Sequence, residues 1–283
     1  MTGNSRAALP AHDDNVRTGP DDICFVIGRP RSGTTVFRKM LDTHPRMFDM
    51  GEIFNESNPN SYFRFLRRRQ AQDPDALLPS QSVDNFLAYV RRCREKSLRK
   101  RPDSRVVVLD VKYDQAHLLC VPWWEITSLP RVFSLIREQE WRVIDIHRKD
   151  GAGMFVSNRV AIETGIYHSK AITDGSGQRA RVHIDPRALI RQLKTTAQAY
   201  ERVTGHFRGY DKYRKVIYEE MFDDGGLFRP ALLDGLSTFF GVDNAFDPVP
   251  RLTKMLVDDI FAHVENAEEI RNVLGQHNML RRP

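Results

Sequence analysis

Four short apolar stretches stand out along the chain, and each is rich in β-branched residues. They cover 23–28, 106–113, 142–147 and 214–218, and their apolar residues run almost continuously instead of alternating with polar ones. Strands with this pattern are usually buried on both faces, as the strands of parallel sheets are. The pattern therefore predicts a buried sheet of parallel strands.

Between these stretches the apolar residues recur with the spacing of amphipathic helices. The helices that we expect cover 33–42, 83–100, 125–139, 151–163, 186–205, 228–240 and 265–275. Strands and helices that alternate in this way favour an α/β fold with a parallel, doubly wound sheet and helices on both faces. We expect residues 1–22, which are polar and contain Pro and Gly, to form a disordered leader, and residues 23–283 to form a single domain.

The composition favours a globular protein, since 41% of the 283 residues are apolar. No apolar run reaches the roughly 18 residues that a membrane span needs, and we expect no secretory signal. The three cysteines, Cys24, Cys93 and Cys120, are far apart, and cysteines and histidines show no metal-ligand spacing. We therefore expect reduced thiols in a cytoplasmic protein, and no metal site.

Basic side chains outnumber acidic ones by 43 to 37, and the resulting net charge of +6 suits an anionic ligand as well as a nucleic acid. Many of the basic residues gather in two places, at 67–69 and at 91–101. Two interpretations stay open for these clusters. They form either the solvated face of a helix, or a docking face for an acidic partner or a polyanionic acceptor.

The first strand runs through a glycine-rich, cationic turn into the first helix, in the segment FVIGRPRSGTTVFRKML. A turn of this kind binds phosphate-like anions, because its N–H groups converge and the helix N-terminus adds about half a positive charge. The side chains that could bind such an anion are Arg29, Arg31, Ser32, Thr34 and Thr35. Gly28 and Gly33 have the spacing of the Walker A motif, but Thr34 stands where that motif has a lysine. An ordinary magnesium-dependent NTPase is therefore disfavoured.

The segment R-P-R-S-G-T-T resembles the 5′-phosphosulfate loop of sulfotransferases, which use 3′-phosphoadenosine 5′-phosphosulfate (PAPS) as donor. The next segment, T-H-P-R-M-F-D-M-G-E, resembles carbohydrate sulfotransferases, including the bacterial nodulation-type enzymes. In that group a Glu at this place acts as the base on the acceptor hydroxyl, so the resemblance implies this role for Glu52. V-I-D-I-H-R-K-D-G-A-G-M-F-V-S resembles the 3′-phosphate motif of the family. Its serine corresponds to Ser157, whereas its arginine falls on Lys149 with Arg148 beside it, and either cation can serve.

Two further segments, T-G-I-Y-H-S at 164–169 and V-I-Y-E-E-M at 216–221, extend the resemblance over residues 23 to 221. It implies transfer of a sulfuryl group to an acceptor hydroxyl, of a carbohydrate or glycolipid, by in-line attack with Glu52 as base and Arg31 neutralising the leaving group. The implied donor-binding residues are Arg29, Arg31, Ser32, Gly33, Thr34, Thr35, Arg148, Lys149 and Ser157. Lys112, at a strand end, and His168, in a polar loop at 165–185, are candidates for contact with the substrates. To be a useful base Glu52 needs a raised pKa, and burial would have to raise it.

Other residues and other functions were open to consideration. His44 is a rival base, although a role in ending the first helix suits it better, and His147 is expected to pack. Trp123 and Trp124 fill the core or stack on a sugar.

One alternative function is a nucleotide-binding, kinase-like enzyme with an altered P-loop, which needs a lysine and magnesium ligands that the sequence does not place. The other is a polyanion-binding protein. A small-molecule or carbohydrate acceptor is the expected partner, with no nucleic acid, and the oligomeric state stays open.

Overall fold

The computed structural model describes residues 19, 22–119, 129–165, 181–252 and 259–277. Its centre is a sheet of five parallel strands in the order β2-β3-β1-β4-β5. The strands are β1 (Ile23–Gly28), β2 (Met47–Glu52), β3 (Val106–Lys112), β4 (Arg142–His147) and β5 (Tyr213–Ile217). The predicted α/β fold with a parallel sheet is therefore confirmed, and all four predicted strands are present.

Strand β2 was not predicted, because its sequence, MFDMGE, lacks a continuous apolar run. It lies at the edge of the sheet, and only Met47 and Met50 are buried along it. An edge strand that is half exposed needs no apolar side chain at every position, so the pattern that identified β1 and β3 does not apply to it.

The helices are α1 (Thr34–Leu41), α2 (Tyr62–Gln70), α3 (Ser82–Lys100), α4 (Arg131–Glu138), α5 (Gly151–Thr164), α6 (Pro186–His206), α7 (Pro230–Phe240) and α8 (Ala267–Gln276). Short 3₁₀ turns are η2 (Pro74–Leu77), η3 (Pro79–Gln81), η4 (Ala116–Leu118), η5 (Tyr218–Glu220) and η6 (Ile260–His263). Seven of the eight α-helices in the described residues match predicted ones, and α2 is the addition. None of the helices in the described ranges is long and apolar enough to cross a membrane.

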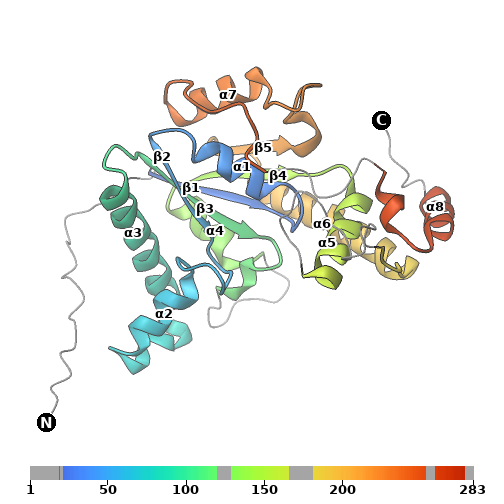
Figure 1. Ribbon diagram of the computed structural model, residues 1–283. Coiled ribbons are helices and arrows are strands. Elements are labelled where there is room, and N and C mark those ends of the chain that lie inside the picture. Colours follow the sequence, from blue (N-terminus) through green and yellow to red (C-terminus); the bar gives the residue numbers. More distant parts are fainter. Residues whose placement is uncertain (1–18, 20–21, 120–128, 166–180, 253–258, 278–283) are drawn as a thin grey trace, which may run out of the picture.

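The two faces of the sheet pack against different helices (Figure 1). In β1 the side chains of Phe25 and Ile27 belong to a core with α2, α3, α4 and α6, whereas Cys24 and Val26 belong to a core with α1 and α7. Successive strand residues point to opposite faces, so this division follows from a strand that is apolar throughout. A third cluster joins α5 and α6 to the C-terminal helix α8. The prediction of helices on both faces is confirmed.

Candidate active site

The turn after β1 has the backbone of an anion-binding loop. Arg31 has φ 67° and Gly33 has φ 96°, so two positions of the turn adopt left-handed conformations. The N–H of Ser32 donates to the Arg29 carbonyl at 3.2 Å, which closes the turn. Helix α1 then begins at Thr34 with Gly33 as its N-cap, and no side chain caps it. Alternating backbone conformations of this type form concave nests of N–H groups, and here the nest adjoins a helix N-terminus.

Two buried polar groups at this loop have no hydrogen-bond partner in the described part of the chain. They are the hydroxyl of Ser32, whose side chain is fully buried, and the Nε of Arg148. Arg148 lies at the loop because its Nη1 donates to the Arg31 carbonyl at 3.1 Å. Buried polar groups are nearly always satisfied, and leaving one unpaired costs about 1–3 kcal/mol. Both groups are suited to an anion bound in the loop.

The structure brings Arg31 to Ser157, although 126 positions separate them in the sequence. The Arg31 Nε donates to Ser157 Oγ at 3.0 Å, and Ser157 lies on the buried side of α5. The loop after β1 and the helix after β4 therefore meet at the carboxyl ends of adjacent strands, where ligands of open α/β sheets bind.

The neighbouring cations Arg148 and Lys149 point to different places. The Arg148 side chain is largely buried, and its guanidinium lies 4.8 Å from the ring centre of Tyr218. Lys149 is exposed and pairs with Glu220 at 2.7 Å. Glu219 accepts the backbone N–H groups of residues 149 and 150, so the residues of η5 mainly support this turn.

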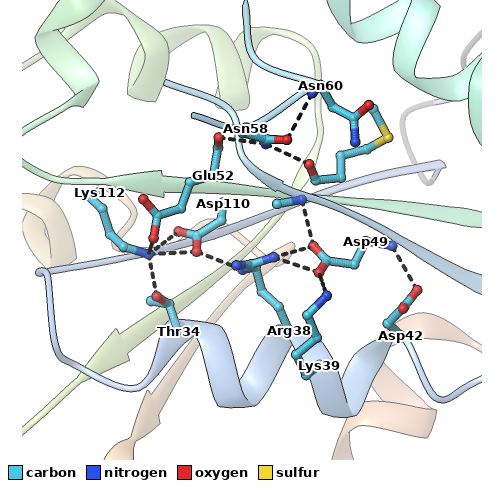
Figure 2. A network of polar contacts seen from close by, with 12 residues as sticks. Thr34, Arg38, Lys39, Asp42, Asp49, Glu52, Asn58, Asn60, Asp110 and Lys112 are labelled. Carbon is cyan, nitrogen blue, oxygen red and sulfur yellow. Dashed lines mark hydrogen bonds and ion pairs between the residues drawn. The ribbon is translucent and has the colours of Figure 1, made fainter. Parts of the chain in front are cut away.

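Glu52 reaches the same region from β2. The register between β2 and β3 shifts between Asp49 and Glu52, and Gly51 has φ 81° at this irregularity. Such a bulge re-aims the side chain that follows it. The Lys112 Nζ lies 3.2 Å from Glu52 Oε1, and it also donates to Thr34 Oγ1 at the start of α1 (Figure 2). Lys112 thus connects the predicted base to the predicted donor loop.

The pKa of Glu52 differs from our expectation. Burial raises it, but the Lys112 ammonium and, at longer range, the Arg38 guanidinium outweigh burial, so the pKa lies below its ordinary value. The raised pKa that a useful base needs is therefore absent in the protein without ligand. Since a neighbouring ammonium stabilises the carboxylate, Glu52 is ionised at neutral pH.

Lys112 and Arg38 are held by buried carboxylates (Figure 2). Asp110, which is fully buried, accepts from Lys112 at 2.6 and 2.7 Å and pairs with the Arg38 Nε at 2.8 Å. Arg38 also pairs with Asp49 at 2.6 Å, and Lys39 pairs with Asp49 at 3.1 Å. Sequence reasoning did not find Asp110, but the segment Asp-Val-Lys at the end of a strand carries a usable signal, because residues two apart share one face of the sheet.

A polar pocket of about 310 Å³ opens beside Glu52. Its lining residues are Thr35, Arg38, Lys39, Asp49, Met50, Gly51, Glu52, Asn55, Asn58 and Asn60. Asn58 shapes the wall, since its amide donates to the carbonyls of Met50 and Glu52 at 2.9 and 2.8 Å. The pocket presents amide and charged groups, which suits a ligand rich in hydroxyl groups.

The structure describes only some of the remaining candidates. His168, Cys120, Trp123, Trp124 and most of the loop 165–185 are outside the described residues, as is nearly all of the expected leader. His44 is buried away from the loop and hydrogen-bonds the Asp243 carbonyl at 2.9 Å. His147 stacks on Tyr200 and lies 2.8 Å from Asp145. Arg29, at the turn, is half exposed.

Comparisons with known proteins found similar proteins among solved structures. No protein-family model and no curated protein sequence matches the chain. Among solved structures, the sulfotransferase domain of the olefin synthase of Synechococcus PCC 7002 has 16% sequence identity and a TM-score of 0.42, over 95% of this chain and 91% of that one. A sulfotransferase from Alicyclobacillus acidocaldarius has 13% identity and a TM-score of 0.45, over 92% of this chain and 96% of that one. The chain is similar to sulfotransferases.

Proposed function

We propose that the protein transfers a sulfuryl group from PAPS to an acceptor hydroxyl. The observation that carries this proposal is the convergence of three sequence motifs at one sheet edge: the loop after β1, the turn before α5 and the end of β2. Their contacts are the Arg31–Ser157 hydrogen bond, the Arg148 hydrogen bond to the loop and the Lys112–Glu52 pair.

The residues of the loop fit the anionic ends of the donor. The N–H groups at the start of α1 and the unpaired Ser32 hydroxyl bind the 5′-phosphosulfate, and Thr34 and Thr35 add hydroxyl donors. Arg148 binds the 3′-phosphate together with Ser157, because its buried Nε has no other partner in the described ranges. Lys149 is the weaker candidate, since its ammonium already pairs with Glu220.

The chemistry needs no covalent bond to the protein. The acceptor oxygen attacks sulfur in line, the bond from sulfur to the phosphate oxygen breaks, and the proton of the hydroxyl passes to Glu52. Arg31 and Lys112 neutralise the negative charge that develops on the leaving phosphate and on the transferred group. As Lys112 turns to the donor, its attraction for Glu52 weakens, and burial then makes the carboxylate more basic.

The acceptor enters through the polar pocket beside Glu52, and a carbohydrate or glycolipid hydroxyl fits its three asparagines and paired charges. A kinase-like function is the second candidate. One observation favours it, because Lys112 approaches the loop at Thr34 and could replace the lysine that is missing from the sequence of the loop.

Thermal unfolding with 3′-phosphoadenosine 5′-phosphate (PAP) separates the two functions, with AMP and Mg·ATP as controls. A ligand at 100 times its Kd stabilises a protein by about 2.7 kcal/mol, which is visible in a melt. We expect PAP to stabilise the wild type and Lys149→Gln, but Arg148→Gln much less. Stabilisation by Mg·ATP alone would support the kinase instead, and no response to any nucleotide would refute both.

The base is tested separately by Glu52→Gln. Loss of a general base typically lowers the rate 10²–10⁴-fold. We expect that loss in turnover of PAPS with an acceptor, while stabilisation by PAP is unchanged because Glu52 does not hold the nucleotide. Full activity of Glu52→Gln would exclude the assignment.

A further inference from the structure

The basic residues of the second sequence cluster separate into an inward and an outward set. Arg94 is buried and donates to the Ser104 carbonyl at 2.7 Å, and Arg101 donates to backbone carbonyls that include that of His44, at 3.1 Å. These two arginines hold the fold together. The remaining cations of the cluster lie at the surface.

The outward set forms one surface with α2. Arg92, Lys96 and Lys100 follow each other at intervals of four residues and therefore share a face of α3. Arg68 belongs to α2, which packs on α3 through the rings of Tyr62, Phe65 and Tyr89. In agreement with this packing, partial burial and then the charges of Lys100, Arg68 and Arg92 lower the pKa of Lys96. We call these four residues the cationic face.

The charges of the cationic face are not balanced within the described part of the chain. No carboxylate there forms an ion pair with Arg68, Arg92 or Lys100, and Glu95 is the one acidic residue among 91–101. Like charges four residues apart destabilise a helix. A group of surface cations without balancing carboxylates attracts a negatively charged ligand.

The cationic face adjoins the polar pocket. The Lys96 ammonium donates to the side-chain oxygen of Asn60, and Asn60 lines the pocket that contains Glu52. Inside the pocket the cations are already paired, Arg38 and Lys39 with Asp49. The pocket therefore favours an uncharged, hydroxyl-bearing part of a ligand, and the cationic face favours a negatively charged part of the same ligand.

We propose that the cationic face binds the carboxylate or sulfate groups of an acidic glycan, one hydroxyl of which enters the pocket beside Glu52. The part of this inference that concerns the hydroxyl rests on the proposed function. A glycan suits the site better than a lipid surface or a nucleic acid, because Asn60 connects the charged face directly to a pocket with three amide side chains.

Two variants of equal charge test the proposal. The first is Arg68→Gln/Arg92→Gln/Lys100→Gln, on the cationic face. The matched control is Arg187→Gln/Arg191→Gln/Lys194→Gln, three exposed cations of α6, which lies on the other side of the molecule (Figure 1). Both variants lose three positive charges, and both should keep the stabilisation by PAP, which shows that they are folded.

The readout is the fluorescence anisotropy of a labelled dextran sulfate oligosaccharide without donor, with neutral dextran of equal length as a second probe. We expect the first variant to bind dextran sulfate at least about tenfold more weakly, which corresponds to 1.4 kcal/mol. The α6 variant should change affinity less than twofold. In turnover, the first variant should raise the KM of a sulfated acceptor and leave that of a neutral one unchanged.

Three results would overturn the proposal. Equal losses of affinity for dextran sulfate in both variants would show that net charge alone determines the binding. Tighter binding to phosphatidylserine vesicles, or to a DNA duplex of matched charge, would assign the cationic face to a membrane or to nucleic acid. The two proposals fail differently. If there is no donor site, PAP gives no stabilisation although the glycan still binds. If there is no glycan site, PAP still stabilises the protein, and the first variant binds dextran sulfate as the wild type does.

Discussion

Replacement of Gly33 by alanine tests the geometry of the donor loop most directly. Gly33 has φ 96°, and a Cβ there would lie 2.3 Å from Cδ2 and 2.6 Å from Cε2 of Tyr218. The Tyr218 ring cannot turn aside freely, because Arg148 lies over it at 4.8 Å and Phe222 packs edge-on at 5.7 Å. The new methyl group therefore strains the backbone and also clashes with a ring that is held in place.

The magnitude follows from these two contributions. A left-handed conformation costs a non-glycine residue about 1–2 kcal/mol, and overpacking costs about 1–3 kcal/mol. Gly33→Ala should therefore destabilise the protein by about 2–5 kcal/mol. Gly209 is the matched control, since it has φ 72° but no atom within 4 Å of a new Cβ. Gly209→Ala should lose only the backbone contribution of about 1–2 kcal/mol.

Urea unfolding measures the loss of stability in both variants. The change in the urea concentration at the midpoint, multiplied by the m-value, gives the change in the free energy of unfolding. In a double-mutant cycle, Tyr218→Ala removes the clash and should recover about 1–3 kcal/mol of the loss in Gly33→Ala. The single variant should also lose most of its stabilisation by PAP. A cost no larger than that of Gly209→Ala, together with no coupling to Tyr218, would refute this description of the loop.

Three further predictions concern buried charges and thiols. Lys112→Met removes one of the two cations that pair with the buried Asp110 and should lower the free energy of unfolding in urea. The loss should be smaller than the about 3–5 kcal/mol of a fully unpaired buried charge, because Arg38 still pairs with Asp110, and adding Asp110→Asn should recover part of it. A neutral result would contradict the buried pair. Because the pKa of Glu52 is lowered in the folded protein, its contribution to stability is present above the unfolded carboxyl pKa of about 4 and is lost as the pH falls through the folded pKa. Between pH 7 and pH 3 the free energy of unfolding should therefore decline less in Glu52→Gln than in the wild type. Burial raises the pKa of both Cys24 and Cys93 to about 12, so neither thiol should react with iodoacetamide at pH 8 until the protein unfolds, as mass spectrometry would show.

The sequence by itself determined most of the architecture. Apolar runs without alternation favour burial on both faces, so β1, β3 and β4 were predictable, and helices between parallel strands followed from connectivity. Strand β5 was found from its β-branched residues, although it is an edge strand along which only Val216 is buried. The glycine-rich, cationic turn after β1 was also predictable, because glycine spacing, hydroxyl side chains and a strand–turn–helix order are local properties of the chain.

Only the tertiary structure decided which groups meet and with what charge. Strand β2 was not visible in the pattern because Asp49 and Gly51 interrupt its apolar residues, and Glu52 comes from its end. The choice between Arg148 and Lys149 depends on which side chain faces the loop, and the lowered pKa of Glu52 depends on Lys112, sixty positions away. Likewise, Arg68 joins Lys96 only when α2 packs on α3. Electrostatic effects act through space, so a sequence can name the charged residues, but only the fold sets the distances between them.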